Sequence, residues 1–291
     1  MKVFALINPQ AGGGLASEIW PRTMKSLGGL NFSFEFTSGP MHAAALARRA
    51  VEEEFDYLLC VGGDGTINEA VQSLANRQTV LVAISAGTGS DFARTTGIHS
   101  ADQAVELMKE GSRSRADLGR VAWGGRSRYF VNILELGFGA KVMARVNAGR
   151  KGHGRNVFNS AVMREMLNLR SYAVELEHDG LSTAGPFTEI VVANGKYFGG
   201  GMLASKNSSI SDGRLDVHAI DAISRISLMR KFSKLRDGSY LEDPKVRSFS
   251  AENVRISGES IPMEMDGETV GNAPAEVSIV PNAVFVLSAG K

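Results

Sequence analysis

The residues best suited to chemistry stand where a short apolar run ends, in the sequence Gly62-Gly63-Asp64-Gly65-Thr66. Glycines at such a junction let the backbone turn tightly and approach a ligand closely. A helix that starts there presents unpaired N–H groups and a positive dipole end, which together attract an anion such as phosphate. Asp64, inside the turn, is suited to hold Mg²⁺, a sugar hydroxyl or a substrate proton. The same residues would also form a plain strand-to-helix turn capped by Thr66.

Two more glycine-rich loops follow apolar runs in this part of the chain. Residues 8–14 come after the run 3–7, and residues 85–94 come after the run 80–84. If these runs are parallel strands, all three loops lie at carboxyl ends of strands, where open α/β sheets bind their ligands. One such loop is weak support because glycine occurs in turns everywhere. Three that converge predict a phosphate-bearing ligand.

The elements that must position these loops alternate through the first 120 residues. Short apolar runs separated by longer helical patterns predict an α/β domain of the doubly wound type. The expected strands cover 3–7, 32–36, 57–61 and 80–84, and the expected helices cover 15–27, 41–54 and 66–74.

Beyond residue 120 the expected strands are connected mostly by turns, which predicts a β-rich domain, an antiparallel sandwich with a few helices. Expected strands include 129–134, 276–280 and 284–287, and expected helices are 141–146, 157–169 and 226–235. We therefore expect domains at 1–120 and 121–291, with the last strand free to return to the first domain.

The amino-acid composition excludes some classes of protein and ligand. The chain has 291 residues, 43% apolar and 22% charged, which is typical of globular proteins. Its 32 Lys and Arg oppose 31 Asp and Glu, which disfavours nucleic acid as the main ligand. Cys60 is the only cysteine, so no intrachain disulfide forms, and a reducing compartment is favoured. Because neither a membrane span nor a secretory leader is evident, we expect a soluble, cytoplasmic chain.

Basic residues gather in two segments. Residues 141–170 contain seven Lys or Arg and a single acid, and residues 225–236 contain five basic residues and no acid. Such segments are either solvated helix faces or a positive surface that meets anionic lipid headgroups.

The motifs together resemble the diacylglycerol kinase catalytic-domain family, which includes bacterial soluble lipid kinases, sphingosine kinases and ceramide kinases. No Walker A pattern and no Rossmann fingerprint in the required placement competes with this resemblance. The matching segments are Asn8-Pro9 with its glycines, Gly62 to Glu69, Gly87 to Arg94, Val192 to Met202, Ser211 to Val217 and Met265 to Glu268.

The resemblance implies an N-terminal domain similar to that of phosphofructokinase and NAD kinase, with ATP as the nucleotide. It assigns nucleotide contacts to Asn8, Thr37, Gly62, Gly63, Asp64, Gly65, Thr66, Asn68, Gly87 and Thr88. One departure is Ser90, which stands where the family usually has Asn.

The resemblance also makes Asp266 the general base that accepts the proton of a lipid hydroxyl. Glu268 is implied as its helper. Asp64, whose place in the turn suits it to a substrate proton, is a further candidate catalytic group. From the residues alone, the segment Asp266-Gly267-Glu268 also fits an ordinary hairpin turn with two solvated acids.

A structural Mg²⁺ is implied at Ser209, Asp212 and the carbonyl of Arg214. The family often carries an extra acid upstream of this segment, where this chain has Lys206 and Asn207.

The predicted function is an ATP-dependent lipid kinase that transfers the γ-phosphoryl group to a hydroxyl of diacylglycerol or a related lipid. We expect it to be attached peripherally to the inner face of the membrane, where its lipid substrate lies. An unpaired sheet edge would allow a homodimer. The alternatives are an NAD kinase or sugar kinase of the same superfamily, and a nucleotide-binding regulator at the membrane that does not turn over.

Overall fold

The computed structural model describes residues 1–86, 90–149 and 155–289. It divides into two compact units: unit 1 comprises residues 1–118 and 281–291, and unit 2 comprises residues 119–280. The chain passes from one unit to the other twice, within strand β5 (Ser114–Trp123) and within strand β17 (Ala275–Val286). Over the described ranges, no helix is both long and apolar enough to cross a bilayer.

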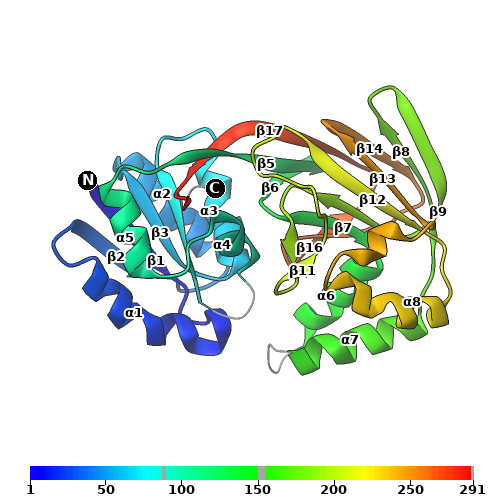
Figure 1. The fold of residues 1–291 in the computed structure, drawn as a ribbon, viewed down its shortest axis with the longest axis horizontal. Coiled ribbons are helices and arrows are strands. Elements are labelled where there is room, and N and C mark those ends of the chain that lie inside the picture. Colours follow the sequence, from blue (N-terminus) through cyan, green and yellow to red (C-terminus); the bar gives the residue numbers. More distant parts are fainter. Residues whose placement is uncertain (87–89, 150–154, 290–291) are drawn as a thin grey trace. The chain divides into compact units, whose positions relative to one another are not determined.

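Unit 1 contains a parallel sheet with the strand order β2-β1-β3-β4-β17. Figure 1 labels β1, β2, β3 and β17. Helices alternate with these strands along the chain, so the predicted doubly wound α/β architecture is confirmed. The strands are β1 (Lys2–Ile7), β2 (Asn31–Phe36), β3 (Tyr57–Gly62) and β4 (Val80–Ser85). The helices are the 3₁₀ turn η1 (Ala11–Gly14), α1 (Leu15–Ser26), α2 (His42–Glu52), α3 (Asp64–Leu74), α4 (Asp91–Thr96) and α5 (Ala101–Lys109).

Helices cover both faces of this sheet, which explains why β3, and β1 after Lys2, are apolar. Val3 and Ala5 of β1 share one hydrophobic cluster with Trp20 of α1 and Val105 of α5. On the opposite face, the guanidinium of Arg49 in α2 stands 4.7 Å from the ring centre of Phe4.

Parallel register brings the carboxyl ends of the three central strands to one edge of the unit 1 sheet. Ile7 at the end of β1 pairs with Val61, and Gly62 at the end of β3 pairs with Ser85 at the end of β4. The glycine-rich loops that begin after residues 7, 62 and 85 therefore leave the sheet side by side, as the sequence predicts.

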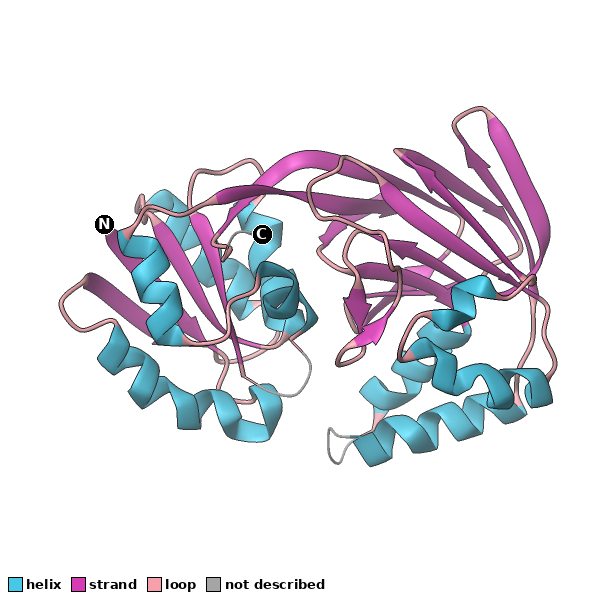
Figure 2. Ribbon diagram, in the orientation of Figure 1, coloured by secondary structure: helices cyan, strands magenta, loops and turns pink. Residues whose placement is uncertain are grey.

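Unit 2 is β-rich, with antiparallel strands and three helices in its described part, which confirms the predicted class (Figure 2). Its strands, besides β5 and β17, are β6 (Arg126–Phe130), β7 (Ile133–Gly137), β8 (Tyr172–His178), β9 (Leu181–Ala193), β10 (Tyr197–Phe198), β11 (Met202–Leu203), β12 (Leu215–Asp221), β13 (Val246–Ala251), β14 (Asn253–Gly258), β15 (Pro262–Met265) and β16 (Glu268–Asn272). Its helices are α6 (Phe138–Ala148), α7 (Arg155–Leu167) and α8 (Arg225–Lys231), with 3₁₀ turns η2 (Phe232–Leu235) and η3 (Ser239–Glu242).

The long strand β9 pairs with three other strands of unit 2. Its first part pairs with β8, and its last part pairs with both β7 and β12. Alternate residues of these strands, such as Leu134, Leu136 and Ile190, point into one large hydrophobic core. The helices α6, α7 and α8 form a separate apolar cluster around Val142, Val162 and Phe232.

Three element predictions are wrong in detail. The expected strand 129–134 is two strands, because β6 ends at Phe130 and β7 begins at Ile133. The expected strands 276–280 and 284–287 are one continuous strand, β17. Helix α3 begins at Asp64, two residues before the expected start at Thr66, with Gly63 as its N-cap. Thr66 lies inside the helix, so the alternative of a plain turn capped by Thr66 is not observed.

Candidate functional site

The first two glycine-rich loops are tied together at the edge of the unit 1 sheet. The side-chain amide of Asn8 donates a 2.9 Å hydrogen bond to Oγ1 of Thr66. The Asn8 backbone N–H donates to the carbonyl of Val61, and the Thr37 N–H donates to the carbonyl of Ile7. The structure therefore brings Asn8, Thr37 and Thr66, three of the predicted nucleotide contacts, to one edge.

Gly62 and Gly63 differ in the space that surrounds them. A Cβ at position 62 would stand 2.6 Å from Oγ1 of Thr66, so the close approach of that side chain requires glycine. A Cβ at position 63 would meet no atom within 4 Å. Open space thus lies against the start of α3, where the N–H groups of the first turn, which includes Gly65, attract an anion.

The acidic side chains of α3 hold the starts of neighbouring helices. Oδ2 of Asp64 accepts the N–H of Asp91, and Oδ1 accepts the N–H of Phe92, each at 3.0 Å, at the start of α4. The Glu69 carboxylate accepts two N–H groups at the start of α2 in the same way. Carboxylates at helix N-termini are stabilising. Asp64 therefore fixes the segment that enters α4, and its catalytic role stays a prediction.

The remaining predicted nucleotide contacts are Asn68, Gly87 and Thr88. Gly87 and Thr88 lie outside the described residues. Asn68 is completely buried within α3. Ser90, which is not a predicted contact but the departure from the family pattern, is the N-cap of α4 and is buried.

In unit 2, Asp266 and Gly267 form the two-residue turn between β15 and β16. Their φ angles of 46° and 91° are both left-handed, as the tightest hairpin turns require. The Asp266 carboxylate points inward and the residue is 9% exposed. Oδ1 accepts the backbone N–H groups of Asn132 at 2.9 Å and Ile133 at 3.1 Å, and Oδ2 accepts that of Val131 at 2.8 Å.

The break between β6 and β7 supplies these donors. Because the chain leaves the strand conformation after Phe130, three successive N–H groups point to one carboxylate. Asn194, at the end of β9, braces the same segment: its side chain donates to the Val131 carbonyl at 2.8 Å, and its N–H donates to the Asn132 carbonyl at 2.9 Å. Neither Asn132 nor Asn194 was predicted as a site residue, although Asn194 lies in a segment that resembles the family.

A second Asp-Gly hairpin turn shows that burial of the acid does not follow from the turn. Asp179 also has φ 46°, and with Gly180 it joins β8 to β9. Its side chain is exposed and pairs with the guanidinium of Arg214 at 3.2 Å. The inward, N–H-bonded carboxylate is therefore a property of the surroundings of Asp266.

Glu268, the first residue of β16, lies next to this turn. Its Oε2 is 3.1 Å from a guanidinium nitrogen of Arg128 on β6. The charge of the predicted helper is thus compensated by a fixed cation.

The predicted metal residues lie in the loop before β12. Oδ1 of Asp212 accepts the N–H of Arg214 at 3.0 Å, and Oγ of Ser209 is 3.2 Å from Oγ of Ser211. The predicted donors are all oxygens, which suits Mg²⁺, but they include a single carboxylate. Among the residues that the structure describes, no group of three or more His, Cys, Asp or Glu side chains could hold a metal ion. The Mg²⁺ site stays a prediction.

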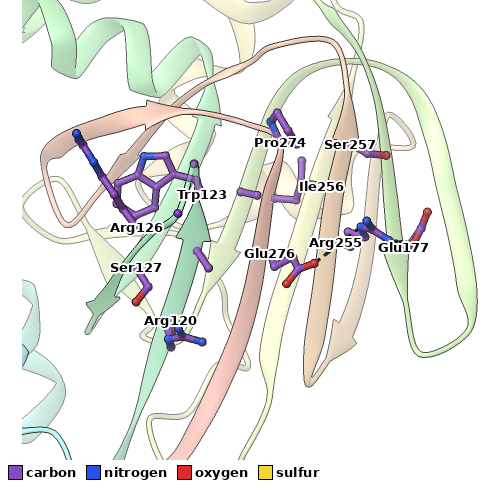
Figure 3. Close-up of a pocket in the computed structure, with 14 residues that line it drawn as sticks. Arg120, Trp123, Arg126, Ser127, Glu177, Arg255, Ile256, Ser257, Pro274 and Glu276 are labelled. Atoms are coloured by element: carbon purple, nitrogen blue, oxygen red, sulfur yellow. Dashed lines mark ion pairs between the residues drawn. The ribbon is translucent and has the colours of Figure 1, made fainter.

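Unit 2 also contains an open groove of about 700 Å³, shown in Figure 3. Trp123 and three arginines are among the residues that line it. Arg255 lies 3.9 Å from Glu177 and 4.0 Å from Glu276, so its charge is compensated. None of the predicted site residues that the structure describes lines this groove.

Comparison with known proteins accounts for both units. Residues 2–121 match the family described as "Diacylglycerol kinase catalytic domain", and residues 132–288 match "YegS C-terminal NAD kinase beta sandwich-like domain". A protein of Mycobacterium tuberculosis named "Diacylglycerol kinase" is 32% identical, covering 98% of this chain and 94% of the relative.

Solved structures share the fold. A diacylglycerol kinase of Bacillus anthracis superimposes with a TM-score of 0.74 at 18% identity, covering 99% of this chain and 96% of the other. An NAD kinase of Archaeoglobus fulgidus, solved in complex with ATP, gives a TM-score of 0.54 at 14% identity, with coverage of 99% and 94%. The family matches along both units and the similarity to the mycobacterial kinase show that the chain belongs to the diacylglycerol kinase family of lipid kinases.

Proposed function

We propose that this protein transfers the γ-phosphoryl group of ATP to a hydroxyl of diacylglycerol or a related lipid, with Asp266 as the general base. The observation that carries the proposal is the buried Asp266 carboxylate, held by three backbone N–H groups in a chain of this family. A carboxylate whose position is fixed in advance can accept the proton of an attacking hydroxyl without first reorganising.

The loops of unit 1 supply the nucleotide side of the proposal. Phosphoryl transfer needs positioning of the reactants and cancellation of charge on the transferred group more than covalent work by the protein. The open space at Gly63 and the N–H groups at the start of α3 suit a phosphate. Mg²⁺ would enter with the ATP phosphates as part of the nucleotide substrate. The fold shared with an NAD kinase solved with ATP supports ATP as the donor.

The remaining residues have supporting roles in this proposal. Glu268, paired with Arg128, would help to orient the lipid hydroxyl beside Asp266. Asp64 would fix the entry to α4, and Asn8 would hold the loop at Thr66 in place.

The test is transfer of labelled phosphate from ATP, with Mg²⁺, into a panel of acceptors. Mixed micelles would contain diacylglycerol, monoacylglycerol, sphingosine, ceramide or phosphatidylglycerol, and NAD and fructose 6-phosphate would be supplied in solution. We expect label in diacylglycerol or a related lipid. Label confined to NAD or the sugar would refute the lipid acceptor, and ATP binding without transfer to any acceptor would favour a regulator.

A structural Mg²⁺ held by Ser209, Asp212 and the Arg214 carbonyl remains part of the proposal. Such an ion would tie together the loop before β12. A bound ion raises the melting temperature of the folded state. We expect Mg²⁺ to raise the Tm of the wild type and of Asp237→Asn, a control at an exposed acid, but not that of Asp212→Asn. An equal rise in all three proteins would remove this site.

We also propose that helices α7 and α8 dock on an anionic membrane. Exposed apolar and basic side chains share this α7–α8 surface, which is the composition of interfacial helices. Other basic residues of the two predicted segments, such as Lys141 and Arg145, instead pair with Glu165. The residues of the α7–α8 surface are Met163, Arg164, Leu167, Arg225, Ile226, Met229 and Arg230.

A further inference from the structure

Three glutamates lie on one face of the unit 2 sheet, next to the turn that carries Asp266. Glu264 on β15 pairs directly with Glu135 on β7. Glu135 pairs with Val191 on β9, two residues from Glu189, so all three side chains point to the same face. Glu264 is 2% exposed, and the other two glutamates are 7% exposed.

These carboxyl groups are buried because helix α6 covers this face, and their neighbours on the opposite face form the apolar core. Burial raises the pKa of Glu264 well above its usual 4.5, and the nearby charge of Glu135 raises it further. Burial likewise raises the pKa values of Glu135 and Glu189. Three ionised carboxylates at such a place would repel one another in a medium that screens poorly.

Glu264 and Glu135 are direct cross-strand neighbours, whose Cβ atoms stand about 4.5–5.5 Å apart, so their carboxyl groups are within reach of a shared hydrogen bond. An ionised carboxylate can only accept hydrogen bonds, so a bond between two carboxyl groups requires a proton on one of them. In its second contact, the Oε2 of Glu264 accepts the N–H of Gly267 at 2.8 Å, a bond that the carbonyl oxygen of a neutral acid also makes and that lowers the pKa less than burial raises it. The hydroxyl of a protonated Glu264 can then donate to Glu135 while its carbonyl oxygen accepts from Gly267.

This arrangement braces the turn of the proposed general base. Gly267 follows Asp266 directly, and both residues have left-handed φ angles. The Gly267 carbonyl in turn accepts the side-chain amide of Asn147 on α6 at 3.0 Å. Glu135 lies two residues beyond Ile133, the last of the three N–H donors to Asp266. The pair thus links the turn to the strand that holds the carboxylate.

We propose that Glu264 is a neutral, protonated carboxylic acid in the folded protein and that it acts, through its hydrogen bonds to Glu135 and Gly267, as a positioning residue for Asp266. The second part rests on the proposed function, whereas the first part is independent of it.

The other charged groups around Glu264 do not supply a cation to ionise it. The described elements packed against β15 are β7, β16 and α6. The cations of α6 pair with Glu165, and Glu268 of β16 pairs with Arg128. The titratable and charged groups of this neighbourhood are Glu135, Glu189, Asp266, Glu268, Tyr240, Arg128, Lys141 and Arg145.

The first test measures how many protons the protein releases on unfolding, from the pH dependence of its free energy of unfolding. A glutamate whose pKa is raised in the folded state keeps a proton that the unfolded chain loses above about pH 4.5. Unfolding then releases this proton, so the free energy of unfolding decreases as pH rises from about 4.5 towards the folded-state pKa. Gln at position 264 has the same shape as the protonated acid, donates to Glu135 and accepts from Gly267. We expect Glu264→Gln to release about one proton fewer on unfolding near pH 7 than the wild type.

Urea unfolding at pH 5 to 8 gives this proton count. The stability of Glu264→Gln relative to the wild type should increase with pH across that range. Identical pH dependence in the two proteins would refute a protonated Glu264, whether or not the protein is a lipid kinase.

The second test separates positioning from a merely structural role. Glu264→Met fills similar volume but cannot accept from Gly267, so we expect kcat per folded molecule to fall by about 10- to 100-fold. The KM for ATP should change by less than about threefold, because the proposed nucleotide contacts belong to unit 1. Glu264→Gln should restore kcat to within about threefold of the wild type.

The outcomes distinguish the two proposals. Wild-type kcat in Glu264→Met, or an equal loss in Glu264→Gln and Glu264→Met, would overturn the positioning role. A wild type that phosphorylates no lipid in the acceptor panel would overturn the proposed function, and the proton count would still decide the state of Glu264. Should Glu264→Met fail to fold, the proton count and the kcat of Glu264→Gln still test the inference.

Discussion

At the scale of single residues, two aspartates in equivalent turns have opposite surroundings. Asp179 faces solvent beside Arg214, while the Asp266 carboxylate accepts three backbone N–H groups. The sequence Asp-Gly predicts a hairpin turn in both cases. The identity of Asp266 as a site residue came from the family resemblance, because the donors are backbone groups that no side-chain pattern reveals.

Asp64 provides a residue-scale prediction. In Asp64→Asn, an amide NH₂ replaces one of the two carboxylate oxygens that accept backbone N–H groups at the start of α4. The NH₂ is itself a donor, so it cannot accept either of these N–H groups. We expect a loss of about 1 kcal/mol in the free energy of unfolding and weaker ATP binding. Since Asp64 acts in this account by positioning, kcat at saturating ATP should fall less than about tenfold.

Glu69→Gln is the matched control, because Glu69 holds the start of α2 in the same manner but is no predicted site residue. Urea unfolding should show a similar loss of stability, and nucleotide titration should show unchanged ATP affinity. A fall in kcat of more than about 100-fold in Asp64→Asn would instead give Asp64 a direct part in the chemistry.

At the scale of elements, the sequence predicts that the glycine-rich loops of unit 1 meet at the carboxyl ends of its strands. It does not predict the three backbone N–H groups of unit 2 that donate to Asp266. Apolar runs buried on both faces predict parallel strands, and parallel strands bring their carboxyl ends to one edge. By contrast, Tyr129 to Leu134 is a strand-like run, apolar except for Asn132, that predicts one strand. Its break after Phe130 depends on tertiary contacts with Asp266 and Asn194, which periodicity does not encode.

The two glycines at the start of α3 give the prediction at this scale. Gly62→Ala forces a Cβ against the Thr66 side chain, so we expect a loss of about 1–3 kcal/mol in stability. Gly63→Ala meets no atom within 4 Å and should leave stability within about 0.5 kcal/mol.

If phosphate occupies the open space at Gly63, however, the added methyl group must weaken ATP binding by about tenfold or more. Urea unfolding and titration with a fluorescent ATP analogue measure the two effects separately. Unchanged ATP affinity in Gly63→Ala would place the nucleotide elsewhere.

At the scale of the whole molecule, a near-zero net charge conceals an uneven distribution. The α7–α8 surface gathers exposed cations and apolar side chains, although part of the predicted basic segments is paired with acids. Arg150 and Lys151, which belong to the first of these segments, lie outside the described residues. The sequence predicted where basic residues cluster, but which of them are paired depends on tertiary contacts with acids such as Asp243, which lies outside both basic segments and pairs with Lys231 of α8.

Charge reversal tests the docking proposal. Arg164→Glu combined with Arg230→Glu should weaken binding to phosphatidylglycerol vesicles at least tenfold at low salt, since each basic residue near an anionic surface contributes about 1 kcal/mol. Arg255→Glu, a reversal in the groove of Figure 3, is the control and should have little effect. Sedimentation with vesicles measures the binding. Equal sedimentation of all three proteins would exclude the α7–α8 surface.

The proposed lipid kinase reaction depends most on Asp266 as the base that accepts the lipid hydroxyl proton. The most direct measurement is kcat for transfer from ATP to diacylglycerol by Asp266→Asn, beside Asp179→Asn as the control in an equivalent turn. We expect Asp266→Asn to lose between about 100- and 10,000-fold in kcat, with ATP affinity within about threefold of the wild type. Asp179→Asn should stay within about twofold. A folded, ATP-binding Asp266→Asn protein that retains more than about a tenth of wild-type kcat would contradict the account.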